Sequence, residues 1–214
     1  MNAWLLKDQK GLGSLELSST HPEPRAGAGE VILEMLYAAL NPADRYLAEG
    51  QYPARPSFPH VLGRDGIGIV REIGENAGAW EVGQKAVIVR SDVGVERAGT
   101  FAERVAVPVE SLVRPPAGWT DEQSAGATLV YLTAWQAITQ WFDLPKPATI
   151  LITGASGGVG VAATQIGQAM NHRVIALSRS RSKSETLRSL GAEITLDPTS
   201  PDWHKQLIKQ LGGR

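Results

Sequence analysis

The sequence ATILITGASGGVGVAATQIGQAM, residues 148–170, decides the fold of this chain. A short β-branched segment, 149–153, runs into a cluster of glycines and then directly into an apolar segment of helical length. In a dinucleotide-binding βαβ unit, the same order of strand, glycine turn and helix places backbone N–H groups at the helix N-terminus, where they hold a pyrophosphate. The stretch therefore predicts a nucleotide site at the start of the helix.

Residues 155–160, A-S-G-G-V-G, match the dinucleotide fingerprint G-x-G-x-x-G with alanine at the first glycine. Gly157 would let the backbone approach the pyrophosphate, and Gly160 would let the helix pack closely on the strand. The residues predicted to bind the phosphates are the four at the turn: Ser156, Gly157, Gly158 and Val159. An ordinary strand–helix turn is the alternative, but the strand before the turn and the helix after it favour the nucleotide site.

Further along the chain, strand patterns alternate with helix patterns. Strands are expected at 149–153, 173–177 and 193–196, and helices at about 184–190 and 203–211. This alternation predicts a parallel, doubly wound sheet. On the helix that follows the glycines, one apolar stripe is expected to face the sheet: Val159, Ala163, Ile166 and Met170.

The alternating pattern stops at Gly-Gly-Arg, residues 212–214, where another strand is expected. The second half is therefore predicted to be an incomplete Rossmann domain, with the strand at 149–153 on an unpaired edge. We expect a truncated form that binds the adenosine and pyrophosphate part of its dinucleotide but is weak or inactive in hydride transfer.

The first half of the chain has the pattern of short strands. Residues 31–39 alternate between an apolar face and a mixed face, and further apolar runs lie at 67–73, 86–89 and 101–107. Such closely spaced strands indicate a small β barrel or sandwich.

A capping box of Thr120 and Gln123 then begins a long helix, expected from Asp121 to about Trp141, and residues 143–147 form a linker. We expect a β domain over residues 1–120 and a nucleotide-binding domain over 121–214.

Composition limits the classes of function. The 214 residues carry a net charge of −1 and 43% hydrophobic residues, so neither nucleic acid nor an anionic membrane is an expected partner. The sequence has no cysteine, which excludes disulfides and thiolate-bound metals. No signal peptide is evident, and no apolar run reaches the roughly 20 residues that span a membrane. A soluble cytoplasmic protein is expected.

Residues 153–160 also match T-G-x-x-x-G-x-G, which resembles the short-chain dehydrogenase signature. In that family the glycine motif lies near the start of the chain and a catalytic Y-x-x-x-K follows it. Here the motif begins past the middle, and no tyrosine occurs after Tyr131. The position of the motif therefore excludes this family.

Taken together, the motifs resemble the medium-chain dehydrogenase/reductase superfamily. The matching segments are NPADRYLAEGQYP (41–53), FPHVLGRDGIGIV (58–70), GTFAERVAVP (99–108), LTAWQAI (132–138) and ASGGVG (155–160). This resemblance implies an α/β fold, in which a chaperonin-like (GroES-like) β domain precedes the Rossmann domain.

Within that superfamily, zinc alcohol dehydrogenases take zinc ligands from a C-G-x-D run and a G-H-E run. The corresponding runs here are 41–44 and 63–65, so Asn41 replaces the cysteine and Arg64 replaces the histidine. Neither side chain offers the donor that zinc requires, so no metal is expected. The pattern is similar to the zinc-independent quinone oxidoreductases.

This resemblance implies hydride transfer from a nicotinamide to a quinone or an α,β-unsaturated carbonyl, an acceptor that needs no metal to be polarised. The residues implied at the catalytic site are Asn41, Asp44, Tyr46, Tyr52 and Arg64. Thr133 is implied to approach the nicotinamide ring. Each also has a structural alternative: a turn residue, a helix cap, a packing aromatic, or an ion-pair partner of Asp65 or Asp44 in the case of Arg64.

The predicted cofactor is NADPH. A domain that prefers NAD carries an acid about 20 residues after the glycines, whereas this chain has Ser178, Arg179 and Lys183 there and no acid before Glu185. Hydroxyl and cationic side chains suit a 2′-phosphate. A solvated basic loop is the alternative.

Two other functions stay open. Enoyl-thioester reduction uses the same fold, with Tyr46 or Tyr52 as a possible proton donor. A non-catalytic dinucleotide-binding or structural protein belongs to a different class. Assembly of the chain into a homo-oligomer also stays open. Of the four histidines, His60 is expected to be a packing residue, whereas His21, His172 and His204 are expected in solvent.

Overall fold

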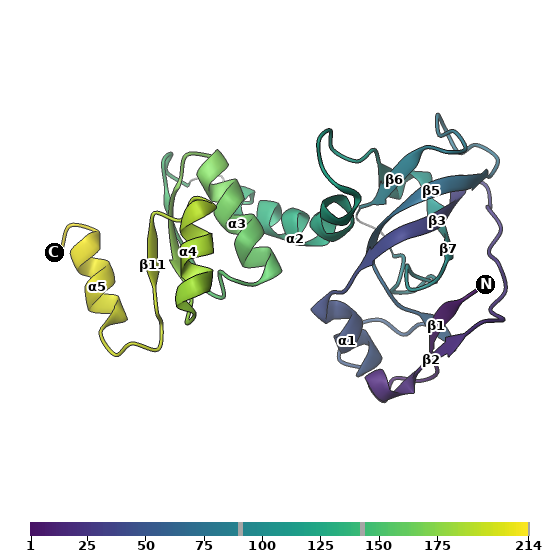
Figure 1. Ribbon diagram of the computed structural model, residues 1–214, viewed down its shortest axis with the longest axis horizontal. Helices are drawn as coiled ribbons and strands as arrows, with labels where there is room; N and C mark the ends of the chain where they lie inside the picture. Colours follow the sequence, from purple (N-terminus) through teal and green to yellow (C-terminus); the bar gives the residue numbers. More distant parts are fainter. Residues whose placement is uncertain (90–91, 142–143, 214) are drawn as a thin grey trace. The chain divides into compact units, whose positions relative to one another are not determined.

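The structure, a computed structural model, describes residues 1–89, 92–141 and 144–213 (Figure 1). The chain forms two compact units, Met1–Leu129 and Val130–Arg214, which are described one at a time. Asp143, the first residue of the predicted linker, lies outside the described residues. In these three ranges, no helix combines the length and apolarity that crossing a membrane requires.

The first unit is built mainly from two antiparallel sheets (Figure 1). The larger has the order β7 (Arg104–Pro108), β3 (Glu30–Ala39), β5 (Asp65–Ile73), β6 (Lys85–Ile88) and β8 (Leu112–Val113). The smaller has the order β2 (Leu15–Ser18), β1 (Ala3–Leu6) and β4 (His60–Val61). One short helix, α1 (Pro42–Ala48), follows β3. The strands expected at 31–39, 67–73, 86–89 and 101–107 correspond to β3, β5, β6 and β7.

Burial does not alternate along β3: Val31, Ile32 and Leu33 are all buried, and the side chains from Leu36 to Ala38 are all exposed. Val31 and Leu33 are fully buried, as predicted, but Tyr37 on the same predicted face is 44% exposed. The reason is a register shift in the pairing with β5, where Met35 pairs with Gly68 and Tyr37 with Ile67. The irregularity changes which side chains face the core beyond that point.

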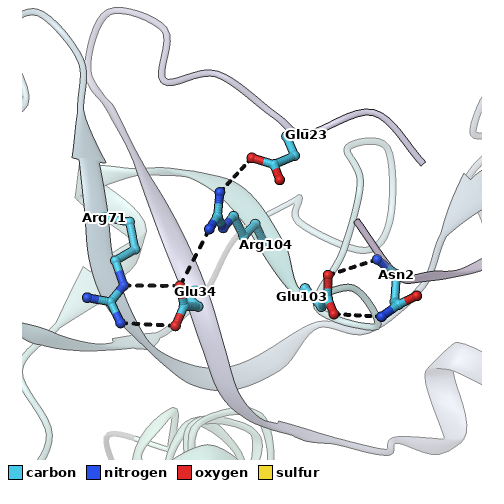
Figure 2. A network of polar contacts seen from close by, with 6 residues as sticks. All are labelled: Asn2, Glu23, Glu34, Arg71, Glu103 and Arg104. Carbon is cyan, nitrogen blue, oxygen red and sulfur yellow. Dashed lines mark hydrogen bonds and ion pairs between the residues drawn. The ribbon is translucent and has the colours of Figure 1, made fainter. Parts of the chain in front are cut away.

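The outer face of the larger sheet carries a network of charged side chains (Figure 2). Arg71 donates two hydrogen bonds to Glu34 at 3.1 and 3.0 Å, and Arg104 contacts Glu23 at 2.5 Å and Glu34 at 3.7 Å. This network ties Glu23, on the segment that leads into β3, to the sheet. Arg71 also holds the pKa of the Glu34 carboxyl below its usual value. Because these charges are exposed and matched, they add little stability.

The second unit contains a parallel sheet with the order β11 (Ile194–Leu196), β10 (Arg173–Leu177), β9 (Thr149–Ile152). This is the 3-2-1 half of a doubly wound fold, as predicted. Among the described residues β9 pairs only with β10, so β9 is an edge strand, which was also predicted.

Helices cover both faces of this sheet (Figure 1). Helices α3 (Gly158–Ala169) and α4 (Arg181–Ser189) pack over the face of β10 that bears Val174 and Ala176. Helix α5 (Trp203–Gln210) packs with Trp203 and Leu207 over the opposite face, whose buried side chains are Ile175, Leu177, Ile194 and Leu196. Alternate side chains of β10 therefore belong to two different cores, one on each face of the sheet.

Of the predicted apolar stripe on α3, Ala163 packs against the core that the helix shares with the sheet, but the most buried positions of the helix lie elsewhere. Val159 is 41% exposed, and the buried positions of the helix are Gly160, Ala162, Thr164 and Gly167. A Cβ on Gly167 would lie 2.7 Å from the Val174 side chain, and one on Gly160 would lie 2.5 Å from the Ala155 Cα. Small residues face the sheet because the helix approaches it closely, which a count of large apolar side chains does not detect.

Helix α2 (Asp121–Thr139) begins at the predicted capping box. The Thr120 N–H donates to Gln123 Oε1 at 3.0 Å, and the Gln123 N–H donates to Thr120 Oγ1 at 3.2 Å. The first half of α2 belongs to the first unit and the second half to the second unit.

Candidate functional site

In the first unit, Asn41 and Asp44 lie at the start of α1. Asn41 is the N-cap with Pro42 after it, and its backbone N–H donates to Asp44 Oδ2 at 2.8 Å. Asp44 therefore satisfies a backbone donor that the helix itself leaves unpaired. Asp44 thus has the capping role that the sequence left open as its alternative, and Asn41, for which a turn residue was the alternative, is the N-cap itself.

Asp65, the first residue of β5, joins this group. The Asn41 side-chain amide donates to Asp65 Oδ2 at 3.2 Å. The Thr128 hydroxyl of α2 lies 2.8 Å from Asp65 Oδ1 and 2.7 Å from the carbonyl oxygen of Ile88. The sequence indicated Asp65 only as a partner for Arg64, and Thr128 carried no signal because its partners are remote in the chain.

The two carboxyl groups are buried. Burial raises the pKa of Asp44 and the pKa of Asp65, and it outweighs the hydrogen bonds and the Arg64 charge that act in the opposite direction. Asp44 Oδ1 is a buried oxygen with no hydrogen-bond partner among the described residues.

Arg64 contacts Tyr52 instead of forming the ion pair that was considered. Its Nη1 donates to the Tyr52 phenol oxygen at 2.8 Å, and the described residues place no carboxylate in ion-pair range of it. Tyr52 is half-buried against a small core of Leu47, Ala54 and Leu62. Tyr46 is 48% exposed and has no such contact, so the structure places only Tyr52 beside Arg64.

The residues at the positions of the zinc ligands are engaged with other side chains. Asn41 donates to Asp65, and Arg64 donates to Tyr52. Within the part of the chain that the structure describes, no three His, Cys, Asp or Glu residues lie close enough together to hold a metal ion.

Two histidines are buried. His60 is buried, as expected, and burial lowers its pKa. The expectation that His172 is solvated is wrong, because its Nδ1 accepts a hydrogen bond from the Ala148 N–H at 3.1 Å and the ring is buried just before β10. A polar sequence context did not indicate this pairing between neighbouring strand ends.

In the second unit, the predicted phosphate-binding turn lies between β9 and α3. Gly157 is the N-cap of α3 and makes no side-chain cap, so the first N–H groups of the helix have no intrahelical acceptor. Gly157 and Gly158 are exposed, Ser156 is half-buried, and Val159 is exposed on the first turn. This arrangement fits a pyrophosphate, since a helix N-terminus supplies both donors and a favourable dipole.

The glycines at this turn differ in what surrounds them. A Cβ on Gly157 would meet nothing nearer than the Gly154 carbonyl oxygen at 3.4 Å, so a side chain there would occupy the exposed space above the helix. A Cβ on Gly158 would approach the Val130 side chain to 3.0 Å. Val130, on α2, therefore lies next to the turn, a neighbour that no sequence pattern indicated.

The end of β10 lies beside this turn. The Ala155 N–H donates to the Leu177 carbonyl at 3.3 Å, which places Ser178 and Arg179 next to the glycines. Ser178 is buried, whereas Arg179 and Lys183 are exposed. Ser180 caps α4 by accepting from the Lys183 N–H at 3.4 Å. Two exposed cations and the N-terminus of α4 therefore lie at the carboxyl end of β10, next to the buried Ser178.

Thr133 is an exposed residue of α2. Its predicted approach to a nicotinamide ring stays a prediction.

Two family models match the chain: the alcohol dehydrogenase GroES-like domain over residues 27–117, and the zinc-binding dehydrogenase model over residues 158–214. Acryloyl-coenzyme A reductase of Sulfurisphaera tokodaii is 31% identical over 188 residues, which are 78% of this chain and 56% of the relative. This chain spans about half the length of the curated relatives it matches.

Solved structures agree with these matches. An NAD-dependent alcohol dehydrogenase is similar with a TM-score of 0.91 at 32% identity, over 100% of this chain and 68% of the other. The quinone oxidoreductase of Pseudomonas syringae pv. Tomato DC3000 is similar with a TM-score of 0.85 at 27% identity, over 99% of this chain and 63% of the other.

A GroES-like β domain followed by a Rossmann-like parallel sheet is the domain order of one superfamily of proteins. The chain belongs to the medium-chain dehydrogenase/reductase superfamily. The similarity to a quinone oxidoreductase, and Asn41 and Arg64 at the zinc-ligand positions, agree with the zinc-independent branch that the sequence predicted. Both the family and the fold class predicted from the sequence are confirmed.

Proposed function

We propose that the protein is a zinc-independent oxidoreductase that uses NADPH to reduce a quinone or an α,β-unsaturated carbonyl. The observation that carries this proposal is the engagement of Asn41 and Arg64, the two replacements at zinc-ligand positions, with Asp65 and Tyr52. A site without a Lewis acid suits an acceptor that is already polarised by conjugation.

NADPH, when bound, would supply the hydride. The N–H groups at the start of α3 would hold its pyrophosphate, and Ser178, Arg179 and Lys183 would hold the 2′-phosphate. A phosphate bound by charged donors gains more than a neutral hydroxyl does at the same place, which supports NADPH over NADH.

Tyr52 is the group we propose to act on the acceptor. Arg64 donates to the phenol oxygen, so the phenol hydrogen is left to point elsewhere. That hydrogen can be donated to the acceptor oxygen, and the guanidinium stabilises the negative charge that then grows on the phenol oxygen. Asn41 and Asp44 stand at a fixed helix start beside this pair and would shape the site.

The test is NADPH oxidation by the purified protein with quinone, enone and enoyl-thioester acceptors, together with elemental analysis and treatment with a chelator. The proposal requires turnover with a quinone or an enone that the chelator leaves unchanged. Stoichiometric zinc with activity lost on chelation would contradict it. So would tight NADPH binding without turnover of any acceptor, which would favour a non-catalytic dinucleotide-binding protein.

Reduction of an enoyl thioester is the second candidate. Its support is the similarity to an acryloyl-coenzyme A reductase, whose named substrate is itself an α,β-unsaturated thioester. The same Tyr52 hydroxyl would serve this acceptor. Preference for acryloyl-coenzyme A over quinones in the same assay would favour this function.

A further inference from the structure

The hydroxyl of Thr128 carries one hydrogen but lies within hydrogen-bond distance of two oxygen atoms. It lies 2.8 Å from Asp65 Oδ1 and 2.7 Å from the Ile88 carbonyl oxygen, and both distances are those of O–H···O hydrogen bonds. A backbone carbonyl only accepts, so it must receive the hydroxyl hydrogen. The contact with Asp65 is then a hydrogen bond only if the carboxyl brings a hydrogen of its own.

We propose that Asp65 is a neutral carboxylic acid at neutral pH, which donates to Thr128 while Thr128 donates to Ile88. In this state Asp65 Oδ2 accepts from the Asn41 amide, so the acid is a positioning residue for Asn41. Its importance for turnover rests on the proposed function, whereas its protonation does not.

The surroundings of Asp65 agree with a neutral acid. Asp65 is 3% exposed, and burial is the largest influence on its pKa, which it raises. The groups that favour the ionised form, and so lower the pKa of Asp65, are the amide of Asn41, the N–H of Leu129 and the charge of Arg64. The Thr128 hydroxyl lowers this pKa only when it donates to the carboxyl, the arrangement that the Ile88 carbonyl opposes. The neighbouring carboxyl of Asp44 interacts unfavourably with an ionised Asp65.

The chain of hydrogen bonds also holds secondary structure together. It joins β5 through Asp65, the first half of α2 through Thr128, and β6 through Ile88. Ionisation of Asp65 would leave two acceptors around one hydroxyl hydrogen, so one of these contacts would have to open. The orientation of the Asp65 carboxyl, and with it the Asn41 amide, would then be lost.

The direct test is an infrared pH titration of the whole protein, which distinguishes carboxylic acids from carboxylates. We compare wild type with Asp65→Asn, Thr128→Val and Thr128→Ser, and we use Asp44→Asn to identify the band of the other buried carboxyl. Thr164→Val is the matched control, because Thr164 is a buried helical threonine that donates to the Gly160 carbonyl at 2.9 Å.

The expected result is a carboxylic-acid band at pH 7 that Asp65→Asn removes and Thr164→Val leaves in place. Thr128→Val should shift or weaken the band, and Thr128→Ser should restore it. Absence of any band at pH 7 that depends on Asp65 would overturn the proposal, whether or not the variants are stable enough to assay further.

Turnover gives a second measurement. Asp65→Asn retains one donor and one acceptor and should keep kcat/KM within about tenfold of wild type, whereas Asp65→Ala should lose more than Asp65→Asn does. Equal losses in the two variants would contradict the positioning role. If the band is present but wild type turns over no acceptor, the proposed function fails while the neutral state of Asp65 stands.

Discussion

At the scale of single residues, the proposed preference for NADPH rests on Arg179, the cation that directly follows Ser178. We predict that Arg179→Ala weakens NADPH binding relative to NADH by roughly 1.5–3 kcal/mol, the range for a hydrogen bond to a charged group. Paired calorimetric titrations with the two dinucleotides measure this ratio.

The matched control is Arg188→Ala, which removes an exposed arginine from the last turn of α4 rather than from the end of β10. It should leave the ratio unchanged. Equal binding of NADH and NADPH by wild type would show that the cations at 179–183 are only a solvated loop.

Tyr52 allows a second prediction at this scale. Tyr52→Phe keeps the ring packed against Leu47 and Leu62 but removes the oxygen that Arg64 contacts. We expect kcat/KM to fall roughly 10- to 150-fold, because a donor to the developing charge is lost. This change corresponds to about 1.4–3 kcal/mol of activation free energy. Steady-state kinetics with a quinone measure the change.

Tyr46→Phe is the control, because Tyr46 is exposed and lacks the Arg64 contact. We expect little change in its rate. If both variants retain full activity, Tyr52 is a packing aromatic, the alternative that the sequence left open.

The sequence indicated the members of the candidate site better than it indicated their contacts. Motif positions were enough to select Asn41, Asp44 and Arg64. Their partners depend on three-dimensional neighbours: the hydrogen bond from Arg64 to Tyr52 spans a loop, and the one from Thr128 to Asp65 joins a helix to a strand. No local pattern carries such pairings, so the roles of Asp65 and Thr128 were not predicted.

At the scale of elements, the effect of replacing a helical glycine by alanine depends on whether a Cβ has room at that position. A Cβ on Gly160 of α3 would lie 2.6 Å from the Gly154 carbonyl oxygen and 2.5 Å from the Ala155 Cα, both backbone atoms. We predict that Gly160→Ala destabilises the protein by roughly 1–3 kcal/mol, because the helix must move off the turn. Chemical unfolding measures the loss.

Gly126 of α2 provides the opposite case. Nothing lies within 4 Å of a Cβ built there, and the residue is exposed inside a helix. Gly126→Ala should therefore stabilise the protein by about 0.5–1 kcal/mol through its helix propensity. If the two variants change stability in the same direction, close packing at Gly160 is not what the glycine provides.

Long elements with a clear period were predicted within a few residues. Helix α2 and strand β10 are examples, since a capping box and a β-branched run define them locally. The two-residue strands β4 and β8 were not predicted, because pairing with distant strands alone makes them strands. The predicted buried face of α3 differs from the observed one because glycines, and not large apolar side chains, occupy the positions that pack on the sheet.

At the scale of the whole molecule, the buried carboxyl groups give stability a pH dependence. The raised pKa of Asp65 means that the folded state binds a proton which the unfolded state has already released. Between the ordinary value of 3.8 and the raised pKa, stability therefore falls as pH rises, by at most about 1.4 kcal/mol per pH unit for one group.

Exposed carboxyls with lowered pKa values, such as those of Glu34 and Asp197, act in the opposite direction at acid pH. The prediction is therefore made for a difference: the free energy of unfolding of wild type minus that of Asp65→Asn should decrease as pH rises through this window. Denaturant unfolding across the pH range measures it. A difference that is independent of pH would mean that Asp65 titrates alike in both states.

The last prediction is about association of two copies of the chain through the unpaired side of strand β9. Strand β9 pairs with β10 alone among the described strands, so its other side presents backbone N–H and C=O groups, with Leu151 43% exposed beside them. Such an edge accepts a strand from a second copy. We predict that a polypeptide of residues 1–214 alone self-associates with increasing concentration, and that Leu151→Lys shifts it toward the monomer because a charge opposes edge pairing.

Leu36→Lys is the matched control, since Leu36 is an exposed leucine on β3, which is paired on both sides. Sedimentation velocity at several concentrations should show association in wild type and in Leu36→Lys, and less in Leu151→Lys. If removing either leucine reduces association equally, general apolar exposure drives it. If wild type stays monomeric at every concentration, the unpaired side of β9 does not pair with a second copy, and the prediction is wrong.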